Sequence, residues 1–259
     1  MERLANPNKR TGFTANALRT WGMIFLAAGA IGRGVIQNHI LGFSGMDMQQ
    51  MLSVMDSSQT AMNYVTLSIG LQALETCAVP IFAVLLVEGI LHTSDFITYF
   101  ARVLGLALVT EIPYNLAMGK GFLDFGSRNP VFSLVFGMLL IFFYQRYSQR
   151  SFKNILIKIL VTLAALIWVK MLTVEFGAPM LLILIVVWSL RAKPMYRNFA
   201  GASAAIACSL LSPFFMASPM AFLIVHMCNW ERDEDNVLVN YLMYPVMLVV
   251  AAAVGAFLL

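Results

Sequence analysis

The chain has 259 residues, of which 60% are hydrophobic and 12% charged, and its mean hydropathy is +0.79. A soluble domain has about 25% charged and about 45–50% apolar residues, so this composition excludes a water-soluble enzyme, a nucleic-acid-binding protein and a disordered regulator. The formal net charge of +4 is expected to reflect membrane orientation, because Lys and Arg collect in cytoplasmic loops. The sequence therefore predicts an all-α fold, a polytopic transmembrane helical bundle in contact with membrane lipid.

The N-terminal segment is polar and basic, and it lacks the apolar core and small-residue cleavage site of a removed signal peptide. We expect residues 1–17 to form a cytoplasmic N-terminal tail and residues 18–259 to form a single transmembrane domain. A helix needs about 20 largely apolar residues to cross the hydrocarbon of a bilayer. The first such stretch is Thr20–Ile40.

Ionisable side chains at membrane depth are costly, so they normally face a bundle interior, a partner or a water-filled cavity. The first of them is Arg33, whose expected partner is Glu75 or a lipid phosphate. The alternative for the helix face that Arg33 shares with Gly22 and Gly29 is a packing seam between helices.

The second candidate span, Ala61–Leu91, is too long for one upright crossing and contains Gln72, Glu75 and Pro80. We therefore expect a tilted or broken helix, with its N-terminal part outside the membrane or at its surface. Gln72 and Glu75 are three residues apart and share one helix face. We take both as candidate substrate-binding residues.

Glu88 and His92, at the end of this span, are four residues apart and would lie on one helix face, where a carboxylate can orient the imidazole tautomer. Such a pair could serve as a general base, so His92 and Glu88 are the candidate catalytic residues. The alternative is a salt bridge or helix cap at the cytoplasmic end of the span. In the turn that follows, Asp95 or Ser94 is expected to cap the next helix.

The third span, Phe96–Met118, carries Arg102 near the cytoplasmic face and Glu111 near the outer face. Arg102 could extend to water or pair with Glu88 across the turn. It could instead bind phosphate groups of a lipid or of coenzyme A, so Arg33 and Arg102 are the candidate cofactor-binding residues. Glu111 lies about half a helical rotation from Arg102, and we take it as a further candidate substrate-binding residue.

The remaining spans bring the expected total to eight or nine, with at least one broken or short helix. They are Pro130–Tyr147, Asn154–Met171, Glu175–Leu190, Asn198–Pro213, Ser218–Asn229 and Val237–Leu259. Ser218–Asn229 is short enough to be a half-helix or re-entrant segment. Nine crossings from a cytoplasmic N-terminus leave most Lys and Arg residues on the cytoplasmic side. The spacing of His, Cys and acidic residues fits no metal site.

The stretch from Val79 to Ala117, VPIFAVLLVEGILHTSDFITYFARVLGLALVTEIPYNLA, contains a long ordered set of motif residues. They are Pro80, Ile81, Phe82, Leu85, Glu88, Gly89, His92, Thr93, Tyr99, Arg102, Leu104, Ala107, Glu111, Pro113 and Tyr114. Two later segments, NPVFSLVFG at Asn129–Gly137 and NYLMYPVML at Asn240–Leu248, extend the set. In these motifs the chain resembles the TraX family of bacterial integral-membrane proteins, and the resemblance covers most of the chain.

The resemblance implies a function in acyl transfer, because this family is associated with N-terminal acetylation of pilin subunits during conjugation and is similar to membrane acyltransferases. The implied donor is acetyl-CoA, as a co-substrate. The implied acceptor is a peptide, protein or glycan at the membrane. The resemblance also implies a multi-pass protein of the bacterial inner membrane, and the oligomeric state stays open.

The sequence departs from the family pattern at three polar positions. Gly29 and Ala30 stand where the first helix of the family has Asp-His, Thr76 stands where it has Arg, and Met247 stands where it has His. Catalysis could have moved to neighbouring charged residues, or it could be lost. The alternatives are therefore a catalytically degenerate scaffold, a lipid- or peptide-binding membrane protein, and a transporter with discontinuous helices.

Overall fold

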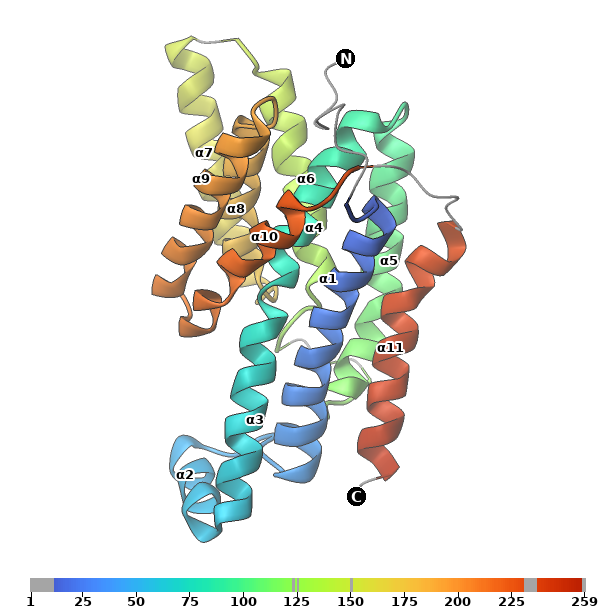
Figure 1. Ribbon diagram of the computed structural model, residues 1–259, viewed down its shortest axis with the longest axis vertical. Coiled ribbons are helices and arrows are strands. Elements are labelled where there is room, and N and C mark those ends of the chain that lie inside the picture. The colour runs from blue at the N-terminus through green and yellow to red at the C-terminus, as the bar shows by residue number, and fades with distance from the viewer. Residues whose placement is uncertain (1–11, 123, 125, 150, 231–236, 258–259) are drawn as a thin grey trace.

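The computed structural model describes residues 12–257, apart from residues 123, 125, 150 and 231–236. In this part of the chain the fold is all-α, as the sequence predicts, and two isolated backbone bridges are the sole β-type pairing. Most helices run roughly along the long axis of the molecule (Figure 1).

The first helix, α1 (Ala15–Gly29), begins where the Thr14 hydroxyl accepts a hydrogen bond from the Ala17 N–H. It continues without a break into the π-helix η1 (Ala30–Ile40). A π-helical run of this length is unusual, because π-helices mostly occur as single-turn bulges, which are frequent at functional sites. Glycine makes close packing possible here, since a Cβ atom at Gly34 would lie 2.3 Å from the Ala117 carbonyl oxygen.

The long second span is broken, as predicted, into α3 (Gln59–Glu75) and α4 (Ala78–His92). The break falls at residues 76–77, where the Thr76 hydroxyl lies 2.7 Å from the Ala73 carbonyl oxygen and 3.1 Å from that of Phe214. Pro80 does not cause the break, because it lies in the first turn of α4, where proline is tolerated. A short helix that the sequence reading did not predict, α2 (Met48–Ser57), precedes α3 and starts in a capping box.

The other helices are α5 (Phe96–Ala117), α6 (Val131–Arg146), α7 (Phe152–Met171), α8 (Gly177–Ser189), α9 (Pro194–Ala207), α10 (Ala221–His226) and α11 (Val237–Phe257). The predicted span Asn198–Pro213 is wrong in its last six residues, because the α-helix ends at Ala207 and short 3₁₀ turns, two of them containing Pro213 and Pro219, follow. The last turns lead into α10, the short helix expected within Ser218–Asn229.

The backbone just before α1 pairs with the segment that follows α10. The Phe13 N–H donates to the Met227 carbonyl oxygen at 3.1 Å, and the Asn229 N–H donates to the Phe13 carbonyl oxygen at 2.8 Å. This pairing joins the two segments at the end of the bundle where α1 begins.

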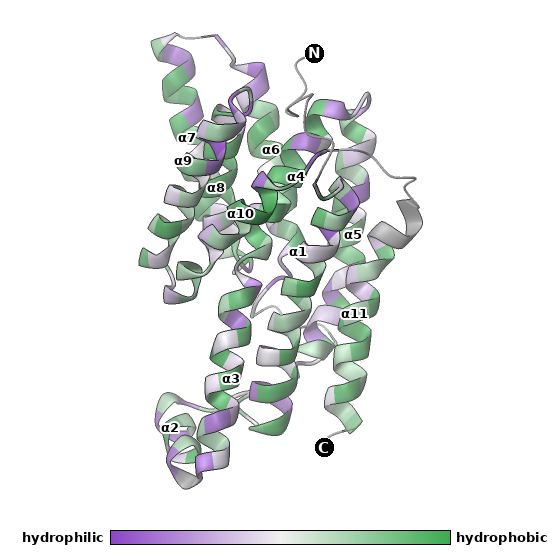
Figure 2. Ribbon diagram, in the orientation of Figure 1, coloured by the Kyte–Doolittle hydropathy of each residue, from purple (hydrophilic) through white to green (hydrophobic). Residues whose placement is uncertain are grey.

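Three helical stretches among the described residues are long and apolar enough to cross a membrane, namely Gln59–His92 taken through its kink, Phe96–Ala117 and Phe152–Met171. Shorter apolar helices cover Val131–Arg146, Gly177–Ser189, Pro213–His226 and Tyr241–Phe257. Hydrophobic residues cover most of the length of α7 and α11 (Figure 2). Because α7 also exposes Ile155, Ile159, Leu163 and Ile167, its surface is suited to lipid and not to water.

Candidate functional site

A cavity of about 530 Å³ lies at the end of the bundle where α4 ends and α5 begins, which we call the cavity end. Its volume is within the range of about 300–1,000 Å³ that is typical of small-molecule sites. Its polar walls come from four helices and the turn between α4 and α5: Arg19 of α1, Glu88 and His92 of α4, Asp95 of the turn, Tyr99 and Arg102 of α5, and Tyr241 of α11. The structure therefore gathers the predicted Glu88, His92 and Arg102 around one cavity.

Glu88 and His92 share a helix face, as predicted, and they contact one another. The His92 Nδ1 atom lies 2.9 Å from the Glu88 carbonyl oxygen and 3.3 Å from the Glu88 Oε1 atom. Both neighbours are acceptors, so we assign the hydrogen of a neutral imidazole to Nδ1, which leaves a lone pair on Nε2. His92 is also the last residue of α4, where the helix dipole favours a positive charge.

Asp95 caps α5, which is one of the two caps predicted. Its Oδ1 atom accepts the N–H groups of Ile97 at 3.0 Å and Thr98 at 3.2 Å, and its Oδ2 atom accepts the Thr98 hydroxyl. The hydrogen bonds from Thr98 are the main cause that lowers the pKa of Asp95 below its ordinary value. The carboxylate is therefore charged at neutral pH, and Arg102, two turns into α5, lines the same cavity.

Tyr99 reaches the cavity across Gly89. A Cβ atom at position 89 would lie 2.7 Å from the Tyr99 hydroxyl oxygen, so a larger residue would displace the phenol ring. The absence of a side chain on Gly89 thus lets the Tyr99 hydroxyl lie close to α4, in the cavity that Glu88 and His92 also line.

A second polar cluster lies deeper in the bundle, around Arg33. Its Nη2 atom lies 2.7 Å from Glu75 Oε2, which confirms the predicted pair, and its Nη1 atom is ion-paired with Glu175. The Tyr114 hydroxyl donates to Glu175 at 2.5 Å, and the Arg33 guanidinium lies 6.0 Å from the Phe176 ring centroid. Arg33 is not among the residues lining the cavity, so the structure does not bring it together with Arg102.

The Glu75 side chain fills the space beside Gly29. A Cβ atom built at Gly29 would lie 1.9 Å from the Glu75 Cδ atom. A carboxyl group therefore occupies the region into which a side chain at position 29 would point, although it comes from α3 and not from α1.

Replacing Gly29 with alanine is expected to destabilise the protein by about 1–3 kcal/mol, because the Glu75 carboxyl group cannot move away without losing its ion pair with Arg33. Equilibrium unfolding in mixed micelles measures the change. Gly70→Ala in α3 is the matched control, since nothing lies within 4 Å of a Cβ atom there, and it should be neutral or stabilising. Equal stability of the two variants would contradict this account of Gly29.

The other candidate substrate-binding residues also lie outside the cavity lining. Gln72 donates to the Ser68 hydroxyl at 3.0 Å, and Ser68 donates to the Gly32 carbonyl oxygen at 2.8 Å. Glu111 accepts hydrogen bonds from Arg128 at 3.0 Å and from the Asn129 side-chain amide at 2.6 Å. These contacts hold α3 against η1 and fix the segment that leads into α6.

Several residues of both clusters were not singled out from the sequence. Arg19 is one of them, although it directly precedes the apolar span that begins at Thr20. Arg197, which lies outside both clusters, was not singled out either, but it is 1% exposed and its guanidinium lies 5.7 Å from the Trp230 ring centroid. Glu175 was predicted only as the first residue of a span. Its carboxylate, next to an apolar stretch, was the signal that could have marked it as a partner for a buried cation.

The sequence model of the TraX family, described as TraX protein, matches residues 40–254 of the chain. The match includes Glu88, His92 and Arg102 and begins after Arg33. No curated protein and no solved structure matches the chain. In the part of the chain that the structure describes, no group of three His, Cys, Asp or Glu residues is arranged to hold a metal ion. The apolar helices, of which α7 exposes much of its surface, indicate a membrane protein. Because the family match covers most of the chain, this membrane protein belongs to the TraX family.

Proposed function

We propose that the protein transfers an acyl group from a coenzyme A thioester to an acceptor at the membrane. Acetyl-CoA is the donor that the family resemblance implies. The observation that carries the proposal is the cavity in which the paired Glu88 and His92 side chains lie with Arg19, Arg102 and a tyrosine hydroxyl. These are the groups that acyl transfer requires, namely a base, phosphate-binding cations and a hydrogen-bond donor.

In this mechanism the His92 Nε2 atom takes the proton from an acceptor amine or hydroxyl as the acceptor atom bonds to the thioester carbonyl carbon. The carbon–sulfur bond then breaks, and the coenzyme A sulfur receives the proton back from His92. Glu88 holds the Nδ1 hydrogen and stabilises the imidazolium that forms in between. The Tyr99 hydroxyl is the proposed donor to the carbonyl oxygen as negative charge develops there.

Arg19 and Arg102 are the proposed phosphate-binding residues, because they line the cavity from two helices, α1 and α5. Cytoplasmic coenzyme A thioesters would reach them if the cavity end faces the cytoplasm. The positive-inside rule supports that orientation, because Arg146, Lys153, Arg191 and Lys193 flank the loops that join α6 to α7 and α8 to α9. We therefore infer a multi-pass protein of the bacterial inner membrane with a cytoplasmic N-terminus.

Calorimetric titration of the purified protein in detergent with acetyl-CoA tests donor binding. Saturable binding is expected, and Arg102→Ala should weaken it about 10- to 100-fold through loss of a charge-assisted contact. Desulfo-CoA, which lacks the thioester, should retain the part of the affinity that the phosphates supply. Lys193→Ala removes a cation just before α9, outside the cavity lining, and should leave the affinity unchanged.

A non-catalytic lipid- or peptide-binding protein is the second candidate. The observation that favours it is that Arg33, Glu75, Gln72 and Glu111 are all engaged in internal contacts. Absence of any saturable acetyl-CoA binding would favour this candidate over acyl transfer. A transporter is a third candidate because α3 and α4 form a broken helix, and solute uptake by proteoliposomes would support it.

A further inference from the structure

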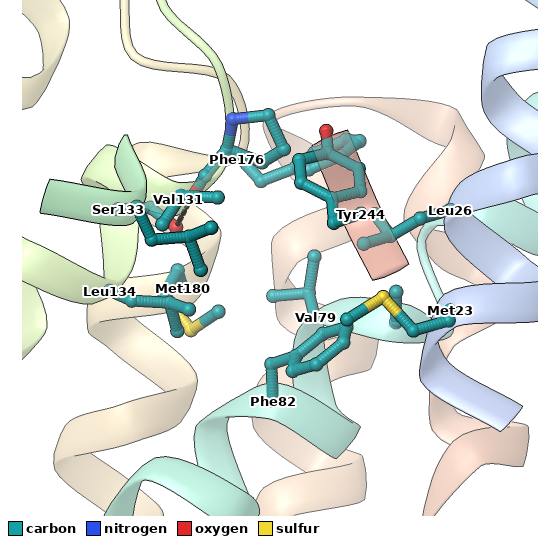
Figure 3. Close-up of a pocket in the computed structure, with 13 residues that line it drawn as sticks. Met23, Leu26, Val79, Phe82, Val131, Ser133, Leu134, Phe176, Met180 and Tyr244 are labelled. Atoms are coloured by element: carbon teal, nitrogen blue, oxygen red, sulfur yellow. Dashed lines mark hydrogen bonds between the residues drawn. The ribbon is translucent and has the colours of Figure 1, made fainter. Parts of the chain in front are cut away.

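An apolar chamber lies deeper in the bundle than the cavity. Figure 3 shows side chains from several helices around a common space, with Met23 and Leu26 on one side and Leu134 and Met180 on the other. Phe176 and Tyr244 lie at one end of this space, and Phe82 lies at the opposite end. The chamber has a volume of about 70 Å³.

The cavity and the chamber share part of their walls. Met23, Phe82, Leu106 and Leu134 line both. Two helices line the cavity and then the chamber at the same spacing. On α1, Met23 comes four positions after Arg19, and on α5, Leu106 comes four positions after Arg102. Each step is about one helical turn, or about 6 Å along the axis. The chamber is therefore the continuation of the cavity towards the centre of the bundle.

The lining of the chamber is suited to a hydrocarbon chain. Its polar side chains are Ser133 and Tyr244, and the Ser133 hydroxyl already donates to the Pro130 carbonyl oxygen at 2.6 Å. A single water molecule needs roughly 10–15 Å³ of such space and two or more polar partners, so the chamber is large enough for about five groups of that size but offers water few partners. A chain of a few methylene groups would fill this volume and needs no polar partners, whereas an acetyl group would leave most of the chamber empty.

We propose that the chamber holds the acyl chain of the donor, and that the preferred donor is a coenzyme A thioester whose acyl chain has about six carbons instead of two. This inference rests on the proposed function, since the phosphates and the thioester would occupy the cavity beside Arg102 and His92. Met23, Phe82, Leu106 and Leu134 then surround the chain where it leaves the cavity.

The test compares the affinities of acetyl-CoA and hexanoyl-CoA for the purified protein in detergent. Each buried methylene group strengthens binding about fourfold, so four additional groups predict a gain on the order of 100-fold. Val79→Phe, which fills the chamber, should remove most of this gain, so that hexanoyl-CoA binds about as weakly as acetyl-CoA does. Val109→Phe makes the same substitution on an exposed face of α5 and should keep the gain, so it controls for the effect of an added phenyl ring outside the chamber.

A second chamber variant keeps the test decisive if Val79→Phe does not fold. Met180→Ala enlarges the chamber and should shift the preferred chain from hexanoyl to octanoyl. Equal affinity for acetyl-CoA and hexanoyl-CoA would overturn the chamber assignment and leave the proposed function standing. Hexanoate binding as tight as hexanoyl-CoA binding would overturn it in favour of a lipid-tail site. Absence of binding by every thioester would overturn the proposed function, and this inference with it.

Discussion

Replacing His92 with alanine is expected to lower the rate of acyl transfer by a factor of about 10²–10⁴, the usual contribution of a general base. The affinity for the thioester should change little, because His92 is assigned to proton transfer and the arginines to phosphate binding. Transfer of a radiolabelled acyl group to membrane acceptors in proteoliposomes measures the rate, and calorimetry measures the affinity. A loss in turnover without a loss in donor affinity is the signature of a catalytic residue.

His226→Ala is the control for this experiment. His226 is an exposed residue at the end of α10 and does not line the cavity, so its replacement should leave transfer unchanged. Glu88→Gln provides a second comparison, because the glutamine retains an acceptor for the His92 Nδ1 hydrogen but cannot stabilise the imidazolium by charge. It should reduce the rate less than His92→Ala does. Full activity of His92→Ala would remove His92 from the mechanism.

Replacing Arg33 with methionine is expected to destabilise the protein by about 3–5 kcal/mol. The substitution leaves the Glu75 and Glu175 carboxylates, whose side chains are 5% and 9% exposed, without their common cation. Removal of one partner from a buried ion pair is more costly than removal of the whole group, because the remaining charge stays desolvated. Equilibrium unfolding in mixed micelles, followed by the fluorescence of the tryptophans, measures the loss.

A triple variant separates this charge effect from simple loss of packing. Combining Arg33→Met with Glu75→Gln and Glu175→Gln removes all three charges, and it should recover a large part of the stability. Arg33→Met alone and the triple variant have the same side chain at position 33. If the triple variant is no more stable than Arg33→Met, the cluster is held by packing and not by charge balance.

Features set by residues close in sequence were predicted correctly. The contact between Glu88 and His92 follows from helical periodicity, and the cap at Asp95 follows from the preference of helix N-termini for short polar side chains. The Arg33 and Glu75 pair was also predicted, although the residues lie on different helices. Two opposite charges within apolar spans have few alternatives to pairing.

Features that depend on how distant helices pack were not predicted. The placement of Glu175 beside Arg33, and of Tyr99 across Gly89, depends on interhelical geometry that no local pattern encodes. The pairing of Glu111 with Arg128, which lies in the next loop, was likewise not predicted. Hydropathy also cannot distinguish a full helix from the 3₁₀ turns after Ala207, because both are apolar.

The pairing of Phe13 with Met227 and Asn229 has a consequence for biosynthesis. The first helix leaves the ribosome early, but the backbone that pairs with its N-terminal residues is made more than 200 residues later. At about 5–20 residues per second, this interval is roughly 10–40 s. During that time α1 lacks this clasp, and Arg33 of η1 lacks Glu175 until that residue has been synthesised. The nascent helix must therefore be shielded by lipid or by the insertion machinery until α10 has been synthesised.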